Sequence, residues 1–135
     1  MLAGTPSSVG ARAELAVATA LTRAGMTVFV PFFAAHSRVD LVAHDGVRLR
    51  RVQCKSCTRR GDVLTFRTSS NTGGVSKHYR GDIDDFGIYS PELDRVYLVP
   101  VELMPSARGC LRIGPPLNNQ RKGVHFASDF EVRFR

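Results

Sequence analysis

The dipeptide Asp45-Gly46 separates two segments whose residues are typical of β-strands. Residues 39–43 precede it, and residues 47–55 follow it with side chains that alternate between two faces. An Asp-Gly step favours a tight reversal of the chain, so we expect the two segments to pair as an antiparallel hairpin. The pairing brings the end of the second strand, with Gln53, alongside the start of the first, with Asp40.

A helix is expected before the hairpin, over about residues 9–24. Ser7 or Ser8 is a suitable N-terminal cap, and Gly25 is typical of the residue that ends a helix. Glu14 lies at the border of the apolar stripe, which is an unusual place for a carboxylate unless the helix flanks a site. The stripe itself consists of Ala13, Val17, Ala20, Leu21 and Ala24.

The rest of the chain is predicted mainly as further short strands. Residues 26–30 have strand composition and end at Pro31, whereas residues 56–82 are polar and residues 105–123 are rich in turn formers. Phe126, Phe130 and Phe134 fit a helical stripe, and Phe130, Val132 and Phe134 fit a strand face equally well, so this segment stays open. Other expected strands are residues 63–66, 86–89 and 95–101.

This order of elements predicts an α/β fold, with a mixed central β-sheet flanked by helices. The length of 135 residues is within the usual span of one domain, so we expect a single domain over residues 1–135. The 43% of hydrophobic residues is enough for a packed core and excludes a disordered tail.

Nineteen Lys and Arg residues face twelve Asp and Glu residues, which gives a net charge of +7. Sixteen of the nineteen are Arg, whose guanidinium group suits bidentate contact with phosphate. An excess of basic residues favours binding to nucleic acid. A GC-rich genome also produces Arg-rich chains, so the charge suggests a polyanionic partner without identifying one.

No apolar run is long enough to cross a bilayer, and the N-terminal residues lack the layout of a secretory signal, so no membrane association is expected. The chain has three cysteines, an odd number that argues against a disulfide framework. We therefore expect a protein of the reducing cytoplasm.

Asp40, Gln53 and Lys55 form the set of residues with the clearest chemical meaning. Gln53 and Lys55 are two positions apart on one strand, so both side chains point to one face of the sheet. Phosphodiester hydrolysis requires oxygen ligands around a divalent cation and a positive group that orients the attacking water. Glu14 can close such a site from the helix, and the backbone carbonyl of Cys54 is available as a further oxygen donor.

These residues resemble the PD-(D/E)XK nuclease superfamily: Glu14 in a first helix, Val-Asp-Leu at 39–41 and Val-Gln-Cys-Lys at 52–55. The branch most similar in layout contains intron-encoded homing endonucleases and Holliday-junction-resolvase-like enzymes, and the resemblance covers residues 8–101. It implies a restriction-endonuclease-like core and an endonuclease that hydrolyses DNA with Mg²⁺, for which Mn²⁺ can substitute. By that resemblance Asp40 is a bridging metal ligand, Glu14 an outer ligand, and Lys55 orients water or stabilises charge.

Gln53 is the main departure, because most of the superfamily has Asp or Glu at this position. A neutral amide oxygen binds a hard cation more weakly than a carboxylate does. The homing-endonuclease branch resembles this chain in using Gln, which favours an active variant. The alternative is a catalytically weak or inactive nucleic-acid-binding module on the same fold.

Nine polar or basic residues after the hairpin suit contact with DNA phosphates, although a solvated loop has the same composition. They are Arg59, Arg60, Arg67, Ser69, Ser70, Asn71, Lys77, Tyr79 and Arg80.

Cys54 and Cys57 form a CxxC pair, for which zinc binding or redox chemistry is a further hypothesis. One active site cuts one strand, so cleavage of duplex or branched DNA predicts a homodimer or a higher symmetric homo-oligomer.

Overall fold

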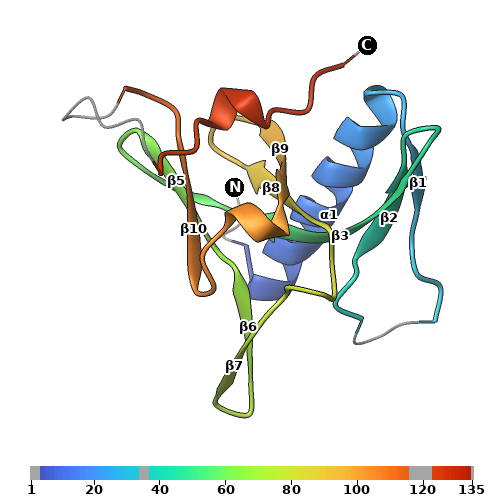
Figure 1. Cartoon of the computed structure of the whole chain (residues 1–135), viewed down its shortest axis with the longest axis horizontal. Coiled ribbons are helices and arrows are strands. Elements are labelled where there is room, and N and C mark those ends of the chain that lie inside the picture. Colours follow the sequence, from blue (N-terminus) through green and yellow to red (C-terminus); the bar gives the residue numbers. More distant parts are fainter. Residues whose placement is uncertain (1–3, 34–36, 116–122, 135) are drawn as a thin grey trace.

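The computed structural model describes residues 4–33, 37–115 and 123–134. Its centre is a five-stranded sheet in the order β1-β2-β3-β8-β9 (Figure 1). Strands β3 and β8 pair in parallel, and the other three neighbouring pairs are antiparallel. This arrangement confirms the predicted α/β class and mixed sheet. The strands are β1 (Thr27–Phe29), β2 (Leu41–His44), β3 (Leu49–Ser56), β8 (Asp85–Ser90) and β9 (Arg95–Pro100).

The predicted hairpin is present as β2 and β3, with Leu41 opposite Val52 and His44 opposite Leu49. Asp45 stabilises the reversal, because its Oδ1 accepts hydrogen bonds from the backbone N–H groups of Val47 and Arg48, both at 2.8 Å. The Asp-Gly step therefore forms the turn between the two strands, as predicted.

Helix α1 (Pro6–Arg23) covers one face of the central sheet. Its N-cap is Thr5, which accepts a hydrogen bond from Ser8 N at 3.2 Å, so the predicted caps Ser7 and Ser8 lie inside the helix. Gly25 follows the helix with a φ of 96°, as predicted for a terminating glycine. Among the described residues, no helix is long and apolar enough to cross a membrane.

The buried side of α1 packs against β3 through Val17, Ala20 and Leu21 on the helix and through Val52 and Cys54 on the strand. Gly87 of β8 also lies under the helix, since an added Cβ there would stand 2.6 Å from Val17 Cγ1. The first helix is thus held close to the strand that carries Gln53 and Lys55.

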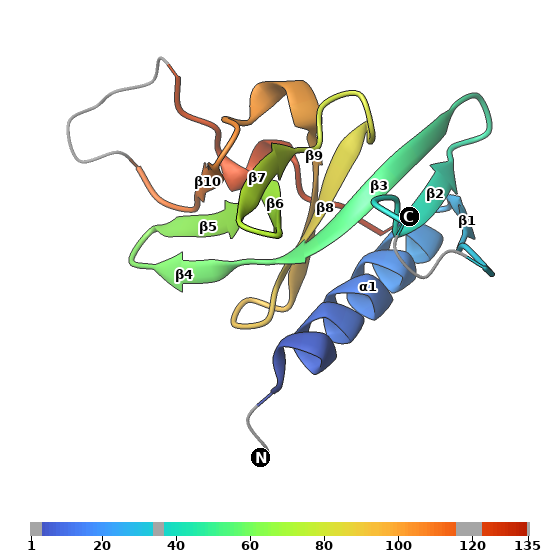
Figure 2. The same ribbon diagram turned by 90° about the horizontal axis from the view of Figure 1, so that it is seen from below.

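The opposite face of the central sheet is covered by a second, three-stranded sheet in the order β10-β5-β4 (Figure 2). Its strands are β4 (Thr58–Arg60), β5 (Val63–Arg67) and β10 (Arg108–Arg112). Leu64, Phe66 and Leu111 pack from it onto β8 and β9. The predicted first helix thus lies on one face of the mixed sheet, and a second sheet covers the other face.

Polar residues after β3 form more structure than the single strand predicted for residues 63–66. Beyond β4 and β5, the chain makes a hairpin of β6 (Ser69–Thr72) and β7 (Val75–His78) that projects from the body (Figure 1). The β10 strand lies within the region predicted as turns. These strands lack a regular apolar alternation, so pattern alone did not indicate them.

The chain after residue 123 settles the choice left open for its phenylalanines. Ala127–Asp129 forms one 3₁₀ turn, η2, and the following residues run beside β9. Leu98 N donates to Phe130 O at 2.9 Å, and Val132 N donates to Val96 O at 2.8 Å. The extended alternative is therefore nearer to the structure than a helical stripe. A second 3₁₀ turn, η1 (Val101–Leu103), follows β9.

Candidate active site

Asp40 completes the β2–β3 ladder with its side chain. Its backbone N–H donates to Val52 O at 2.9 Å, and its Oδ2 accepts from the backbone N–H of Cys54 at 2.8 Å. The N–H and C=O of one strand residue point to the same edge, so the Cys54 carbonyl faces the edge where Asp40 lies. The Asp40 carboxylate and the Cys54 carbonyl thus lie at the same place, along the edge of β3 that faces β2.

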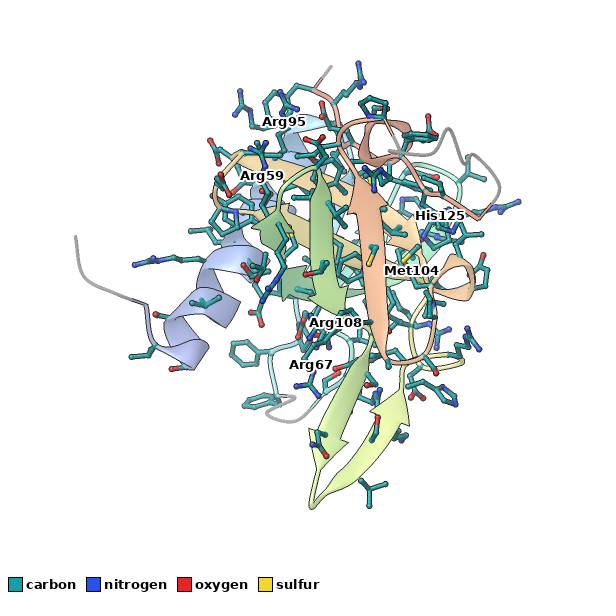
Figure 3. The ribbon with its side chains drawn as sticks, turned by 90° about the vertical axis from the view of Figure 1, so that its left-hand side faces the viewer. Arg59, Arg67, Arg95, Met104, Arg108 and His125 are labelled. Carbon is teal, nitrogen blue, oxygen red and sulfur yellow. The ribbon has the colours of Figure 1, made fainter. Side chains whose placement is uncertain are left out.

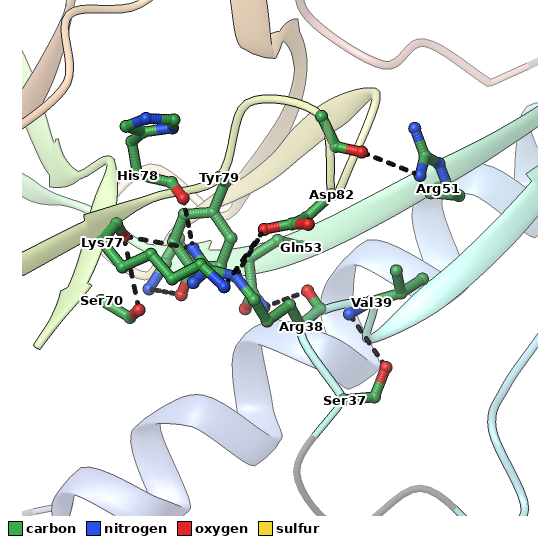
Figure 4. Close-up of polar contacts among 12 residues, drawn as sticks. Ser37, Arg38, Val39, Arg51, Gln53, Ser70, Lys77, His78, Tyr79 and Asp82 are labelled. Atoms are coloured by element: carbon green, nitrogen blue, oxygen red, sulfur yellow. Dashed lines mark hydrogen bonds and ion pairs between the residues drawn. The ribbon is translucent and has the colours of Figure 1, made fainter. Parts of the chain in front are cut away.

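Gln53 and Lys55 point to the face of β3 opposite Cys54, which is buried beneath α1. The Gln53 side chain is only 8% exposed, and its Nε2 donates to the Arg38 carbonyl at 2.6 Å (Figure 4). Because the amide nitrogen is engaged in this way, the amide oxygen is the atom left for a further partner. The predicted common face of Gln53 and Lys55 is confirmed.

Lys55 is held by a buried aromatic ring. Its Nζ donates to the Tyr79 hydroxyl at 3.2 Å and lies 5.0 Å from the ring centroid. Tyr79 is 4% exposed and also contacts the guanidinium of Arg38, whose Cζ lies 3.9 Å from the centroid. The ring therefore fixes two cations near the site.

Arg38 connects the segment before Asp40 to β7 and to the segment that follows it (Figure 4). Its Nη2 donates to the carbonyls of Lys77 and His78 at 3.1 and 2.8 Å, and its Nε lies 3.3 Å from Asp82 Oδ2. The sequence interpretation did not single out Arg38. The sequence signal that could have identified Arg38 is its position two residues before Asp40, because a cation there can act on the same site.

Glu14 and Asp40 line one pocket of about 310 Å³ between α1 and the start of β2, together with Val30, Pro31 and Ser37. The pKa of Asp40 is raised to about 6, mainly because the group is partly buried and also because the Glu14 charge is near. The Cys54 N–H bond and the Lys55 charge act in the opposite direction. Glu14 and Asp40 thus line one pocket, and Lys55 is near enough to Asp40 for its charge to act on that carboxyl, whereas Gln53 is not among the residues that line the pocket.

These groups fit an oxygen-preferring divalent cation. They offer two carboxylates, from Glu14 and Asp40, and two neutral oxygens, from the Gln53 amide and the Cys54 backbone. The raised pKa of Asp40 indicates a partly buried carboxylate that a cation would stabilise in its charged form. No group of three His, Cys, Asp or Glu suited to a metal occurs in the described part of the chain, so any cation here relies partly on neutral donors.

The two cysteines of the CxxC pair lie in different cores. Cys54 packs with the α1 cluster, whereas Cys57 packs with Leu64 on the other side of the sheet. Burial raises the pKa of both thiols, which disfavours the thiolate that zinc requires. This geometry does not support a joint zinc or redox site.

Seven of the nine residues expected to contact DNA retain access to solvent, namely Arg59, Arg60, Arg67, Ser70, Asn71, Lys77 and Arg80. Tyr79 and Ser69 are each 4% exposed, so surface contact is the wrong interpretation for these two. Tyr79 supports Lys55 from within, and Ser69 accepts a hydrogen bond from Ser76 at 3.1 Å.

The neighbouring acidic residues also have structural partners. Arg50 binds Asp85 through two hydrogen bonds of 2.8 and 2.7 Å, and Arg51 binds Asp84. These two carboxylates thus form ion pairs that connect β3 with β8 and the residue before it.

A family model described as PD-(D/E)XK endonuclease matches residues 5–133. Among solved structures, the fold is similar to that of a bacterial homing endonuclease, I-Ssp6803I, with a TM-score of 0.75. The similarity covers 95% of this chain and 89% of the other at 21% identity, which supports likeness of fold. Comparison with curated proteins gave no match.

Proposed function

The chain belongs to the PD-(D/E)XK endonuclease family, and from this membership we propose that it hydrolyses DNA phosphodiester bonds with a divalent metal ion. One observation carries the proposal: the Asp40 carboxylate is fixed to Cys54 N at 2.8 Å, on the strand that presents Gln53 and Lys55. An acid is thereby held beside an amide and an ammonium group, as hydrolysis of a phosphodiester requires. We take residues 1–135 to act as one domain.

Asp40, Glu14, the Gln53 amide oxygen and the Cys54 carbonyl would hold the cation. Mg²⁺ suits these oxygen donors, and Mn²⁺ has similar preferences. When bound, the cation supplies positive charge to the phosphoryl oxygens as negative charge develops on them.

Lys55 supplies the second positive group. Its ammonium orients the attacking water and stabilises charge near the scissile phosphate. Tyr79 limits the positions that the Lys55 side chain can adopt, because its hydroxyl accepts the Nζ hydrogen bond. Asp40 must be ionised for this chemistry, which the Lys55 charge and the Cys54 N–H both favour.

A cleavage assay tests the proposal. Purified protein is incubated with Mg²⁺, Mn²⁺ or EDTA and with supercoiled, linear duplex, branched or single-stranded DNA. The wild-type protein should cut at least one substrate with either metal and none with EDTA. Asp40→Ala and Lys55→Ala should bind DNA but lose cleavage by at least about 10²-fold.

Asp129→Ala is a matched control, because Asp129 is an exposed carboxylate in η2 beside β9, at the other edge of the sheet. It should cut like the wild type. Full cleavage by Asp40→Ala would refute the assignment. Binding of DNA without cleavage under any of these conditions would instead support the inactive nucleic-acid-binding module, which Gln53 motivates.

The substrate panel also separates the possible roles in homing, junction resolution, restriction or repair. Since one site cuts one strand, we propose a homodimer or higher symmetric homo-oligomer on duplex or branched DNA. Light scattering with and without DNA tests this, and a monomer in both states would contradict it.

All three cysteines are free thiols, which agrees with our proposal of a reducing, cytoplasmic location.

A further inference from the structure

The three-stranded sheet has an outer face rich in arginine. Strand β5 buries Leu64 and Phe66 against the central sheet, so Val63, Thr65 and Arg67 point outward. Their partners in register extend this outer face across β4 and β10. The eight outward residues include no acid: Thr58, Arg60, Val63, Thr65, Arg67, Arg108, Cys110 and Arg112.

Arg67 and Arg108 stand directly opposite each other in the β5–β10 ladder. The next pair along, Thr68 and Ala107, is hydrogen-bonded through Thr68 N and Ala107 O at 3.1 Å. Hydrogen-bonded and non-hydrogen-bonded pairs alternate, so the two arginines occupy the position at which opposed side chains approach most closely. Two like charges at such a position repel each other.

The charges on this outer face are largely unengaged. Within the described residues, Arg60, Arg67 and Arg108 make no side-chain ion pair or hydrogen bond. Arg112 differs, because it donates to the Gly114 and Pro115 carbonyls. Figure 3 shows Arg67 and Arg108 together, where the small sheet meets the β6–β7 hairpin. The outer face thus carries positive charge for which the described residues provide no acidic partner.

We propose that this outer face binds the phosphate backbone of the DNA at a place separate from the cleavage site. The inference rests on the proposed function for the identity of the polyanion. A phosphate between Arg67 and Arg108 offsets their repulsion and offers acceptor oxygens to both guanidinium groups. Such contacts position the duplex and do not depend on its sequence.

The dimensions of the outer face fit more than one phosphate contact. Val63, which is opposite Arg60, is four residues from Arg67 along β5, a distance of roughly 13 Å at about 3.3 Å per residue. One DNA strand carries a charge about every 3.4 Å of helix axis, so an outer face of this length can reach more than one phosphate. The hydroxyl of Thr58 lies between the two ends and can also donate to phosphate, whereas the Thr65 hydroxyl already donates to the Thr58 carbonyl at 3.4 Å.

The test measures DNA binding apart from cleavage. Fluorescence anisotropy of a short labelled duplex of arbitrary sequence is recorded in EDTA over a range of KCl concentrations. Wild type is compared with the double variant Arg67→Ala/Arg108→Ala and with the matched control Arg95→Ala. Arg95 is an exposed arginine of β9 that pairs with Glu131 at 3.8 Å and lies far from Arg67 in Figure 3.

The double variant should weaken binding by about tenfold or more, and its salt slope should fall by about 1.8, or about 0.9 for each arginine removed. Each single variant should give about half of this fall in slope, and Arg95→Ala should match the wild type.

A double variant with the same salt slope as Arg95→Ala would overturn the inference, even for a wild-type protein that cuts DNA. Conversely, a wild type that binds DNA without cutting it would remove the proposed nuclease activity and leave this inference in place, provided that the slope falls as stated. The two failures are therefore distinguishable.

Discussion

The ammonium group of Lys55 lies 3.2 Å from the hydroxyl of Tyr79 and 5.0 Å from the centre of its ring. The same buried ring contacts Arg38, so one aromatic side chain restrains a proposed catalytic cation and a structural one. Tyr79 comes from the segment after β7, whereas Lys55 comes from β3. The position of Lys55 thus depends on how these two parts of the chain pack together.

Replacing Tyr79 with Phe should lower kcat about fivefold to tenfold with little change in KM. The ring and its packing remain, but Lys55 loses a hydrogen bond of about 1 kcal/mol that restricts its position. Steady-state cleavage kinetics measure the effect. Tyr97→Phe is the control, because the Tyr97 hydroxyl is buried without a hydrogen-bond partner in the described structure. Equal kcat values for the two variants would show that the Tyr79 hydroxyl does not position Lys55.

Gln53→Glu should destabilise the metal-free protein by about 1–3 kcal/mol at neutral pH. The amide nitrogen now donates to the Arg38 carbonyl at 2.6 Å, and a carboxylate would place an acceptor against that carbonyl. Chemical denaturation measures the loss. Acidic pH should reduce the loss, because a protonated Glu can donate, and Mg²⁺ should offset part of it. A variant as stable as wild type at neutral pH would mean that the Arg38 contact contributes nothing.

Metal affinity should rise with pH up to about 6 and then level off. Burial raises the pKa of Asp40 from 3.8 to about 6, so the carboxylate ligand is largely protonated below that value. Affinity should therefore fall about tenfold for each pH unit below the pKa. Isothermal titration with Mn²⁺ at several pH values measures this. Asp40→Asn should bind weakly with little dependence on pH, and a wild-type affinity that is flat between about pH 5 and pH 7 would contradict the role of Asp40.

The same raised pKa determines in which direction the stability of the metal-free protein changes with pH. The folded protein holds the Asp40 proton more tightly than the unfolded chain, so this group stabilises the fold most at pH below 3.8. That contribution is lost as the pH rises through about 6. Thermal unfolding in EDTA should show this loss in the wild type, and the part due to Asp40 should be missing in Asp40→Asn.

Gly87→Ala should destabilise the protein by about 1–3 kcal/mol and also reduce cleavage. Its Cβ would lie 2.6 Å from Val17 Cγ1 and 3.1 Å from Val52 Cγ1, so α1 must move away from the sheet and carry Glu14 with it. Urea denaturation and the plasmid assay measure the two effects. Gly10→Ala is the matched control: nothing lies within 4 Å of its added Cβ, and it should stabilise α1 by about 0.5–1 kcal/mol.

Much of the site was predictable because it depends on local rules. Asp45-Gly46 fixes the hairpin, and the alternation of β3 decides that Gln53 and Lys55 share a face. Tyr79 was not recognisable as the partner of Lys55 and of Arg38, since its contacts with them span 24 and more residues of chain and depend on tertiary packing. The strands β4, β6, β7 and β10 were missed for a similar reason: their polar residues form strands only because neighbouring strands supply hydrogen-bond partners.

The Asp40 carboxylate accepts the Cys54 N–H hydrogen bond that a backbone carbonyl would accept if the pairing of β2 with β3 continued. The candidate site can therefore be lost by a change in strand pairing alone. A substitution or insertion that let β2 continue by one residue pair would give Cys54 a main-chain partner. The sheet would gain regularity, while the carbonyl at that edge would be consumed and the acid displaced. The interruption in strand pairing is thus what leaves the Asp40 carboxylate and the Cys54 carbonyl available for the proposed metal ion, and a regular sheet at this edge would remove both.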